Sequence, residues 1–267
     1  MSDQETPLLI DERDGVAWLT MNRPERLNAL NQGLTDALRT YFQALQDRPG
    51  IRVVVLQGAG RGYCAGLDLK DRTGAAPRDV QAGLAGQKAI RDIMIAMREC
   101  PQPIISIVQG AAAGGGLGIA LASDIRLCTP DARFNAAFIK IGVSGCDMGS
   151  SYFLPRMVGA SLAAEMLLTG RFLHADRAYH MGFVSKVGPL AEIEAEARQL
   201  VAEMLNATPL ALRLTKDCMN HNIDAPGLRA AIAMEDRNQI LCTRGGDFNE
   251  GIRAFLEKRK PVYGQAE

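Results

Sequence analysis

Short apolar runs bounded by glycine, proline or polar residues mark the first two thirds of the chain. They lie at 8–12, 16–21, 51–56, 104–108 and 125–128, and their β-branched content is typical of buried strands. Arg13, Asp14 and Gly15 separate the first two runs as a hairpin turn would. We therefore expect a hairpin followed by strands that longer segments separate.

Those longer segments carry apolar residues at helical spacing. The predicted helices are 27–45, 80–98, 117–124, 152–158, 161–168, 175–181 and 190–206, and residues 209–260 are helical throughout. No strand pattern follows Val187, and the polar stretch 71–77 is expected to be a mobile loop. The sequence predicts a mixed α/β core over 1–205 and a C-terminal helical domain over 206–267 that serves oligomerisation.

Charge and composition exclude several classes of partner. Lys plus Arg and Asp plus Glu each number 30, so no net field attracts nucleic acid or an anionic membrane. No apolar run is long enough to span a membrane, and the acidic N-terminus does not resemble a targeting peptide. Scattered cysteines without a CxxC pair indicate reduced thiols and a cytoplasmic protein. The histidines His174, His180 and His221 lack metal-ligand spacing, so we expect neither a metal nor a permanently bound cofactor.

The stretch 103–124, PIISIVQGAAAGGGLGIALASD, passes from a strand through nearly bare backbone into a helix. The first amides of a helix lack internal partners and carry partial positive charge, and small residues let a ligand oxygen approach them. This arrangement predicts a donor for a negatively charged oxygen. The alternative is that these small residues serve only close packing of helix on strand.

A second strand followed by glycines repeats this pattern upstream. The run 51–56 leads through Gly58, Gly60 and Gly62 into the segment 64–70. If the two strands are neighbours, a backbone N–H from each turn can meet at one point, which is the geometry that an oxyanion requires.

The chain resembles the crotonase superfamily, also called the enoyl-CoA hydratase/isomerase family. The matching segments are NRPERLNAL (22–30), VVVLQGAGRGYCAGLDLK (53–70), PIISIVQGAAAGGGLGIALASDIRLC (103–128), YFLPRMVG (152–159), LLTGRFLHADRAYHMGFVSKV (167–187) and EGIRAFLEKRKP (250–261). The resemblance implies a spiral of ββα units with a C-terminal helical domain. It also implies a homotrimer or a dimer of trimers, and an acyl-CoA thioester substrate that brings coenzyme A with it.

The resemblance also assigns site residues. The oxyanion donors would be the backbone N–H groups of Leu67 and Gly115, in agreement with the two glycine turns. Contacts to coenzyme A would come from Arg26, Leu27, Ala65, Asp68 and Lys70, and from Phe255 and Lys258 reaching a neighbouring subunit. Plainer interpretations stand beside these: Arg26 and Lys70 as solvated charges, Asp68 as a turn or cap residue, and Phe255 as helix packing.

The sequence departs from the family pattern at both glutamates of the enoyl-CoA hydratases. Gly118 and Phe138 stand at these positions, and neither can activate water or move a proton. Asp147, in GCDMGSSYFLP, resembles the aspartate of dienoyl-CoA isomerases and that of 4-chlorobenzoyl-CoA dehalogenases. The usual hydration of a double bond is therefore not expected from this chain.

We expect Asp147 beside Phe138, Met148 and Leu67 in a poorly solvated substrate pocket, where burial favours its protonated form and suits proton transfer. The pocket itself is assigned to Phe138, Gly118 and Met148. The alternative is that Asp147 caps a helix beginning near Met148. Its neighbour Cys146 is interpreted as a packed thiol. The leading hypothesis is isomerisation or atypical hydration of an acyl-CoA. Hydrolysis or displacement with Asp147 as nucleophile or base, and non-catalytic acyl-CoA binding, remain open.

Overall fold

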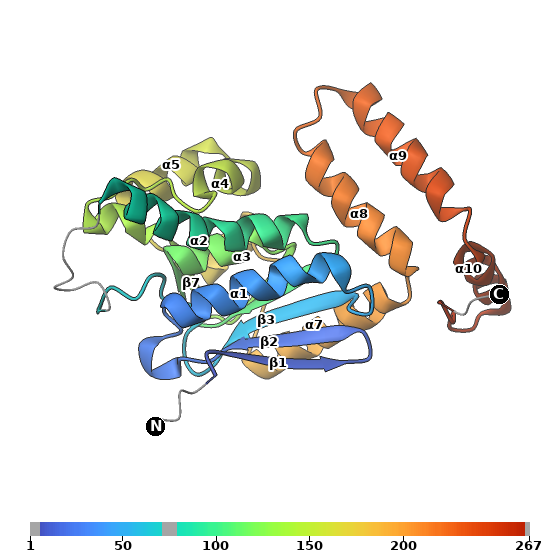
Figure 1. The fold of residues 1–267 in the computed structure, drawn as a ribbon, viewed down its shortest axis with the longest axis horizontal. Helices are drawn as coiled ribbons and strands as arrows, with labels where there is room; N and C mark the ends of the chain where they lie inside the picture. The colour runs from blue at the N-terminus through green and yellow to red at the C-terminus, as the bar shows by residue number, and fades with distance from the viewer. Residues whose placement is uncertain (1–5, 71–78, 265–267) are drawn as a thin grey trace.

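A computed structural model describes residues 6–70 and 79–264 (Figure 1). Its larger sheet has six strands within these ranges, in the order β1-β2-β3-β4-β6-β9. Strands β1 and β2 pair antiparallel, and each later neighbour is parallel. The strands are β1 (Leu8–Arg13), β2 (Val16–Met21), β3 (Val53–Gly58), β4 (Ile104–Val108), β6 (Ile125–Cys128) and β9 (Lys186–Val187). A smaller sheet joins β5 (Ala111–Ala113), β7 (Arg133–Asn135) and β8 (Leu173–His174).

Helices cover both faces of the larger sheet. Alternate residues of β3 face opposite ways, so Val54 and Leu56 pack with α1 (Gln32–Ala44) and α2 (Val80–Glu99). Val53 and Val55 instead pack with α7 (Leu190–Leu205) on the other face. Helix α3 (Gly115–Ala122) packs on α2 and is buried along its whole length. The remaining helices of this region are α4 (Ser150–Val158), α5 (Ala160–Thr169) and α6 (Ala175–His180), with 3₁₀ turns at Pro24–Arg26, Leu45–Asp47 and Ala137–Ile141.

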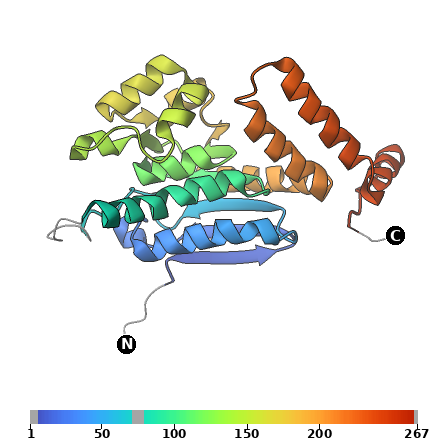
Figure 2. The same cartoon turned by 45° about the horizontal axis from the view of Figure 1, so that its top comes forward.

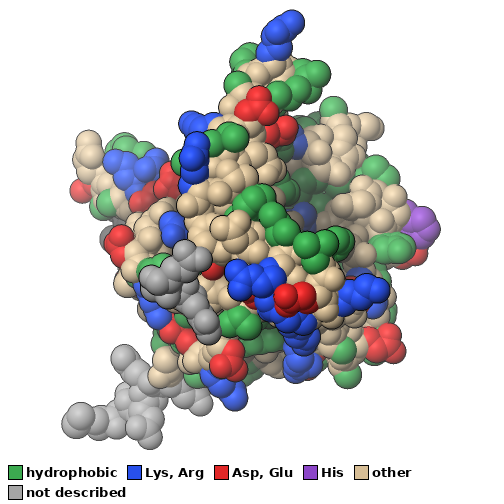
Figure 3. Space-filling view, turned by 90° about the vertical axis from the view of Figure 1, so that its right-hand side faces the viewer, with side chains coloured by type: hydrophobic (Ala, Val, Ile, Leu, Met, Phe, Trp, Pro, Cys, Tyr) green, Lys and Arg blue, Asp and Glu red, His purple; other side chains and the backbone are tan. Residues whose placement is uncertain are grey.

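The C-terminal helices extend away from this body (Figures 1 and 2). They are α8 (Pro209–Asn222), α9 (Leu228–Cys242) and α10 (Gly246–Glu257). Figure 3 looks onto this side, where apolar side chains stand at the surface. The exposed apolar side chains of α9 and α10 include Leu228, Ile240, Phe248, Phe255 and Leu256. A role for 206–267 in assembly stays a prediction. Among the helices described, none has the length and apolar character needed to cross a membrane.

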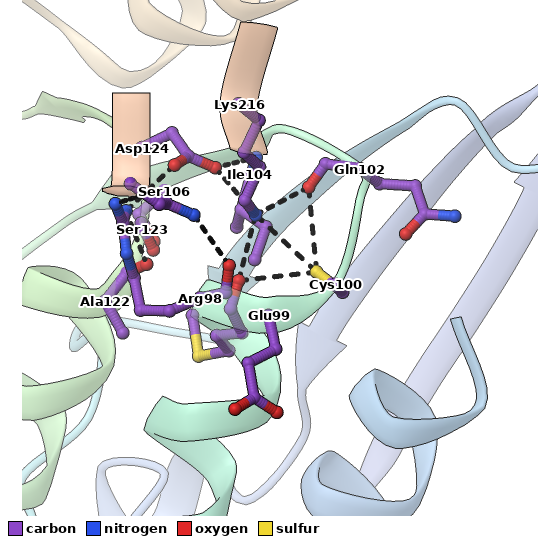
Figure 4. A network of polar contacts seen from close by, with 12 residues as sticks. Arg98, Glu99, Cys100, Gln102, Ile104, Ser106, Ala122, Ser123, Asp124 and Lys216 are labelled. Carbon is purple, nitrogen blue, oxygen red and sulfur yellow. Dashed lines mark hydrogen bonds and ion pairs between the residues drawn. The ribbon is translucent and has the colours of Figure 1, made fainter. Parts of the chain in front are cut away.

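A buried polar network fastens α8 to the core (Figure 4). The Lys216 side chain is 4% exposed, and its Nζ donates to the carbonyls of Met97 at 2.9 Å and Gln102 at 2.8 Å. The same Nζ lies 3.0 Å from Asp124 Oδ2. Asp124 also accepts from the Ile104 N–H and from Arg98. One buried cation therefore ties α8 to the end of α2 and the start of β4.

Replacing Lys216 by Met is expected to lower the free energy of unfolding by about 3 kcal/mol, because it removes one partner of a buried ion pair. Urea denaturation measures the loss. Lys88→Met is the control, because Lys88 is exposed on α2. Equal stability of the two variants would show that the network does not hold α8.

The structure confirms the mixed α/β core and the helical C-terminal region, and it corrects several boundaries. Helix α1 begins at Gln32 rather than at Leu27, because Asn31 caps it by accepting the Leu34 N–H. Leu27 has φ of 49°, which a helix cannot contain. Helix α3 begins at Gly115 and ends at Ala122, not at 117 and 124. The short strands β5, β7, β8 and β9 were not predicted, and the expected loop 71–77 lies outside the described residues.

Candidate active site

The two strand and glycine units lie side by side, as the sequence predicts. Strands β3 and β4 are parallel neighbours, with Val54 opposite Ile104 and Leu56 opposite Ser106. Beyond their ends, the Cys64 N–H donates to the Ala111 carbonyl at 3.0 Å, and the Ala113 N–H donates back to the Cys64 carbonyl at 3.0 Å. Strand β5, the part of the glycine and alanine run that was expected to be bare turn, thus joins one glycine turn to the other.

This pairing places the turn before Leu67 against the start of α3. Gly66 has φ of +91°, and a Cβ there would lie 2.7 Å from the Ala113 carbonyl oxygen and 3.3 Å from the Gly115 nitrogen. Only glycine allows this approach. Within the described residues, neither the Leu67 N–H nor the Gly115 N–H donates a hydrogen bond to the protein. Both remain available to an oxygen of a ligand.

The glycine run serves close packing and also leaves the Gly115 N–H without a partner in the described part of the chain. A Cβ at Gly116 would lie 2.1 Å from the Cys64 carbonyl oxygen, so the second residue of α3 must also lack a side chain. Cys64 itself is fully buried, and this burial raises the pKa of its thiol to about 12. The thiol therefore stays protonated and acts as packing.

An ion pair supports the turn that carries Leu67. Arg23 donates to Asp68 Oδ2 at 2.9 Å, and the Lys70 N–H donates to Asp68 Oδ1 at 3.2 Å. Burial alone would raise the pKa of Asp68. The hydrogen bond and charge of Arg23 outweigh that effect and hold the pKa of this carboxyl below its ordinary value. Asp68 thus serves the turn, which is the plainer of its two interpretations, and its carboxylate is already engaged.

The Arg23–Asp68 pair predicts a specific pH dependence of stability. Because the pKa of Asp68 is lower in the folded chain, its contribution is complete above the unfolded value of 3.8 and is lost as the pH falls through the folded value. We expect the free energy of unfolding of wild type to fall more steeply below about pH 5 than that of Asp68→Asn. Urea denaturation between pH 7 and pH 3 tests this, and parallel curves would contradict it.

A cavity of about 460 Å³ opens between α2 and α4. Met94 and Ile95 of α2 face Met148, Tyr152 and Phe153 across it. The full lining is Gln87, Arg91, Met94, Ile95, Arg98, Glu99, Asp147, Met148, Gly149, Tyr152 and Phe153. Its mainly apolar wall suits an acyl group.

Asp147 lines this cavity, but its surroundings differ from those expected. It is half-buried rather than enclosed, and Phe138 and Leu67 are not among the lining residues. Its Oδ1 accepts from Gln87 Nε2 at 2.6 Å and from the Met148 N–H at 2.7 Å. The expectation of a poorly solvated setting was wrong, because the loop 142–149 lies at the surface beside α2.

The two alternatives for this loop are also corrected. Helix α4 begins at Ser150 after Gly149, and no side chain caps it, so Asp147 is not its N-cap. Cys146 is exposed rather than packed.

The two positions without glutamate are closed by other side chains. A Cβ at Gly118 would lie 2.9 Å from Met148 Cβ and 2.9 Å from Met94 Cε. Phe138 is buried and lies over Gly114. A Cβ added at Gly114 would be 3.4 Å from Phe138 Cε1. Met148 is buried with φ of 48°, a conformation that a side chain of this size rarely adopts. Methionine and phenylalanine thus fill the space beside α3.

The residues expected to bind coenzyme A fall in two groups. Arg26 and Lys70 are exposed near the Leu67 turn, where the Ala65 N–H donates to the Leu27 carbonyl at 3.0 Å. Phe255 is 83% exposed on α10, and Lys258 follows at the end of that helix. Helix α10 lies at the far end of the molecule from α4 (Figures 1 and 2). Contacts of all these residues with coenzyme A stay predictions, and for the second group they require a neighbouring subunit.

Sequence reasoning missed three residues of this site: Arg23, Gln87 and Met94. Gln87 and Met94 lie two turns apart on α2, so the helical spacing places them on one face. That pattern could have indicated a shared surface. Arg23 meets Asp68 only through the tertiary fold, and no local pattern marks the pair.

Comparisons with known proteins show the family of this chain. The profile of a family described as enoyl-CoA hydratase/isomerase matches residues 11–266. The chain belongs to this family. The 1,2-epoxyphenylacetyl-CoA isomerase of Escherichia coli is 34% identical over 253 residues, which cover 93% of this chain and 95% of that protein. The crotonyl-CoA hydratase of Syntrophomonas wolfei is 30% identical over 255 residues, covering 95% and 96%.

Solved structures of family members have the same fold. The crystal structure of the enoyl-CoA hydratase from Bacillus anthracis superposes with a TM-score of 0.90 at 30% identity, covering 96% of this chain and 98% of that one. The protein is therefore a hydratase/isomerase-type enzyme of a family that acts on acyl-CoA thioesters.

Proposed function

We propose that the protein isomerises an acyl-CoA by moving a proton along the acyl chain. The observation that carries this proposal is the pair of unpartnered amides, Leu67 N–H and Gly115 N–H, on two turns that pack against each other. Met148 connects them to Asp147, because it lies against the Gly115 position and lines the same cavity as Asp147. The thioester oxygen accepts both hydrogen bonds. Each donor is worth about 3 kcal/mol once negative charge develops on that oxygen.

Asp147 then transfers the proton. Its Oδ1 accepts from Gln87 and from the Met148 N–H, whereas no partner of Oδ2 is found among the described residues. Oδ2 is therefore the oxygen that takes a proton from one carbon of the bound acyl-CoA, which becomes an enolate. The same oxygen then returns the proton to another carbon of the acyl chain. One carboxylate suffices for this exchange, whereas hydration also needs a water held at the reacting carbon. The side chains over Gly118 are thioethers, which hold a water poorly.

The test is a panel of 2-enoyl-, 3-enoyl- and arylacetyl-CoA esters incubated in deuterated water and followed by mass spectrometry. We expect deuterium uptake and double-bond migration for at least one ester, with little gain of water. Hydrolysis of every ester without deuterium uptake would overturn the proposal. A single turnover in ¹⁸O-water that leaves label in the Asp147 carboxylate would do so as well, because it indicates nucleophilic attack.

A further inference from the structure

We propose that Met148 determines reaction specificity by keeping water away from the reacting carbons, so that the bound ester exchanges a proton instead of adding water. This inference rests on the proposed function and concerns the same site. It assigns the outcome of the reaction to a residue that takes no part in proton transfer.

The first observation is the place of the Met148 side chain. It is 4% exposed and lies over the first turn of α3. A Cβ at Gly115 would be 3.3 Å from Met148 Sδ, and one at Gly118 would be 2.9 Å from Met148 Cβ. Because Met148 also lines the cavity, its side chain joins the cavity wall to the helix start that carries the Gly115 N–H.

The second observation is the backbone that holds it there. Met148 has φ of 48°, and the hydrogen bonds of its neighbours fix this unusual conformation. The Met148 N–H donates to Asp147 Oδ1, and the Ser150 N–H donates to the Asp147 carbonyl at 2.9 Å. Ser150 Oγ in turn accepts the Asp147 N–H at 3.1 Å. The turn that aims Asp147 at the cavity thus also directs Met148 over the glycines.

The third observation is the low polarity of the atoms around the Gly115 and Gly118 positions. A buried water usually needs two to four polar partners. The atoms nearest to the Gly115 and Gly118 Cβ positions are Leu30 Cδ1, Met94 Cε and the Met148 side chain, and the Met148 carbonyl is the single oxygen among them. Once the thioester oxygen accepts from the Leu67 and Gly115 N–H groups, this wall therefore offers an additional water few polar partners.

The experiment compares Met148→Gly with Met148→Leu. Glycine adopts positive φ without strain and removes the wall, whereas leucine keeps an apolar side chain of similar volume. The probe is crotonyl-CoA in deuterated water, and the readout is the ratio of 3-hydroxyacyl-CoA formed to deuterium exchanged into the ester. This ratio does not depend on how much of a variant folds.

We expect Met148→Gly to raise the ratio by about tenfold, which corresponds to about 1.4 kcal/mol between the competing barriers. The admitted water adds to the β-carbon as its proton passes to Asp147, and the same carboxyl then protonates the α-carbon. Met148→Leu should keep the wild-type ratio. If Met148→Gly does not fold, Met148→Ala replaces it, with folding judged by circular dichroism. A ratio that stays unchanged in the glycine or alanine variant, while wild type still exchanges deuterium, overturns the role of Met148 alone. A wild type that exchanges no deuterium with any ester overturns the proposed function as well.

Discussion

Replacing Asp147 by Asn is expected to slow deuterium exchange by about 10²- to 10⁴-fold, the usual contribution of a positioned acid or base. Asparagine has the shape of aspartate, and its amide oxygen can still accept from Gln87 and from the Met148 N–H. The turn therefore keeps its conformation, and the group that takes the proton is lost. Binding of a CoA ester, measured by calorimetry, should change little because Leu67 N–H and Gly115 N–H remain.

Asp47→Asn is the matched control, because Asp47 is an exposed carboxylate in the 3₁₀ turn after α1. It undergoes the same loss of charge and should retain wild-type exchange. An Asp147→Asn enzyme with full activity would remove Asp147 from the mechanism. The cavity and the two amides would then need another proton carrier, and the half-buried position of Asp147 would have no chemical role.

The two turns that carry the backbone N–H donors could be predicted from sequence, because glycines mark the places where two backbone segments come close together. At Gly66 and Gly116 a side chain would collide with backbone atoms, and the parallel pairing of β3 with β4 follows from two strong apolar runs. The three-residue strand β5 could not be predicted, since its alanines carry no pattern that distinguishes strand from turn. It forms because the Cys64 turn offers it a partner.

The side-chain half was harder to predict. The motif around Asp147 indicated the residue but not its burial, which depends on how the loop 142–149 lies against α2. Gln87 supplies a donor from 60 residues away, and this contact exists only after α2 and α4 have packed. Met148 gave no sign of its φ of 48°, because methionine has no preference for that conformation. Contacts of this kind are set by the tertiary fold rather than by local sequence.

Gly116→Ala is expected to have the largest effect on both stability and activity among the glycine variants of this turn. The new Cβ would lie 2.1 Å from the Cys64 carbonyl oxygen and 2.8 Å from its carbon, and neither backbone atom can rotate away. Forcing extra volume into a packed site typically costs about 1–3 kcal/mol. We expect the free energy of unfolding to fall by an amount near the upper end of this range, and urea denaturation measures it. If α3 moves to relieve the clash, Gly115 N–H no longer faces the Leu67 turn, and losing one such donor slows turnover by about 10²- to 10³-fold.

Gly83→Ala separates this effect from the general consequence of adding a methyl group to a helix. Gly83 lies exposed in α2 with no atom within 4 Å of its Cβ position, so alanine should stabilise the protein by about 0.5–1 kcal/mol and leave turnover unchanged. The two substitutions should change stability in opposite directions, because the added methyl group meets a carbonyl at Gly116 and solvent at Gly83. A Gly116→Ala protein as stable and active as wild type would mean that α3 can shift on the Cys64 turn without cost. The two amides would then not be held in fixed register by packing.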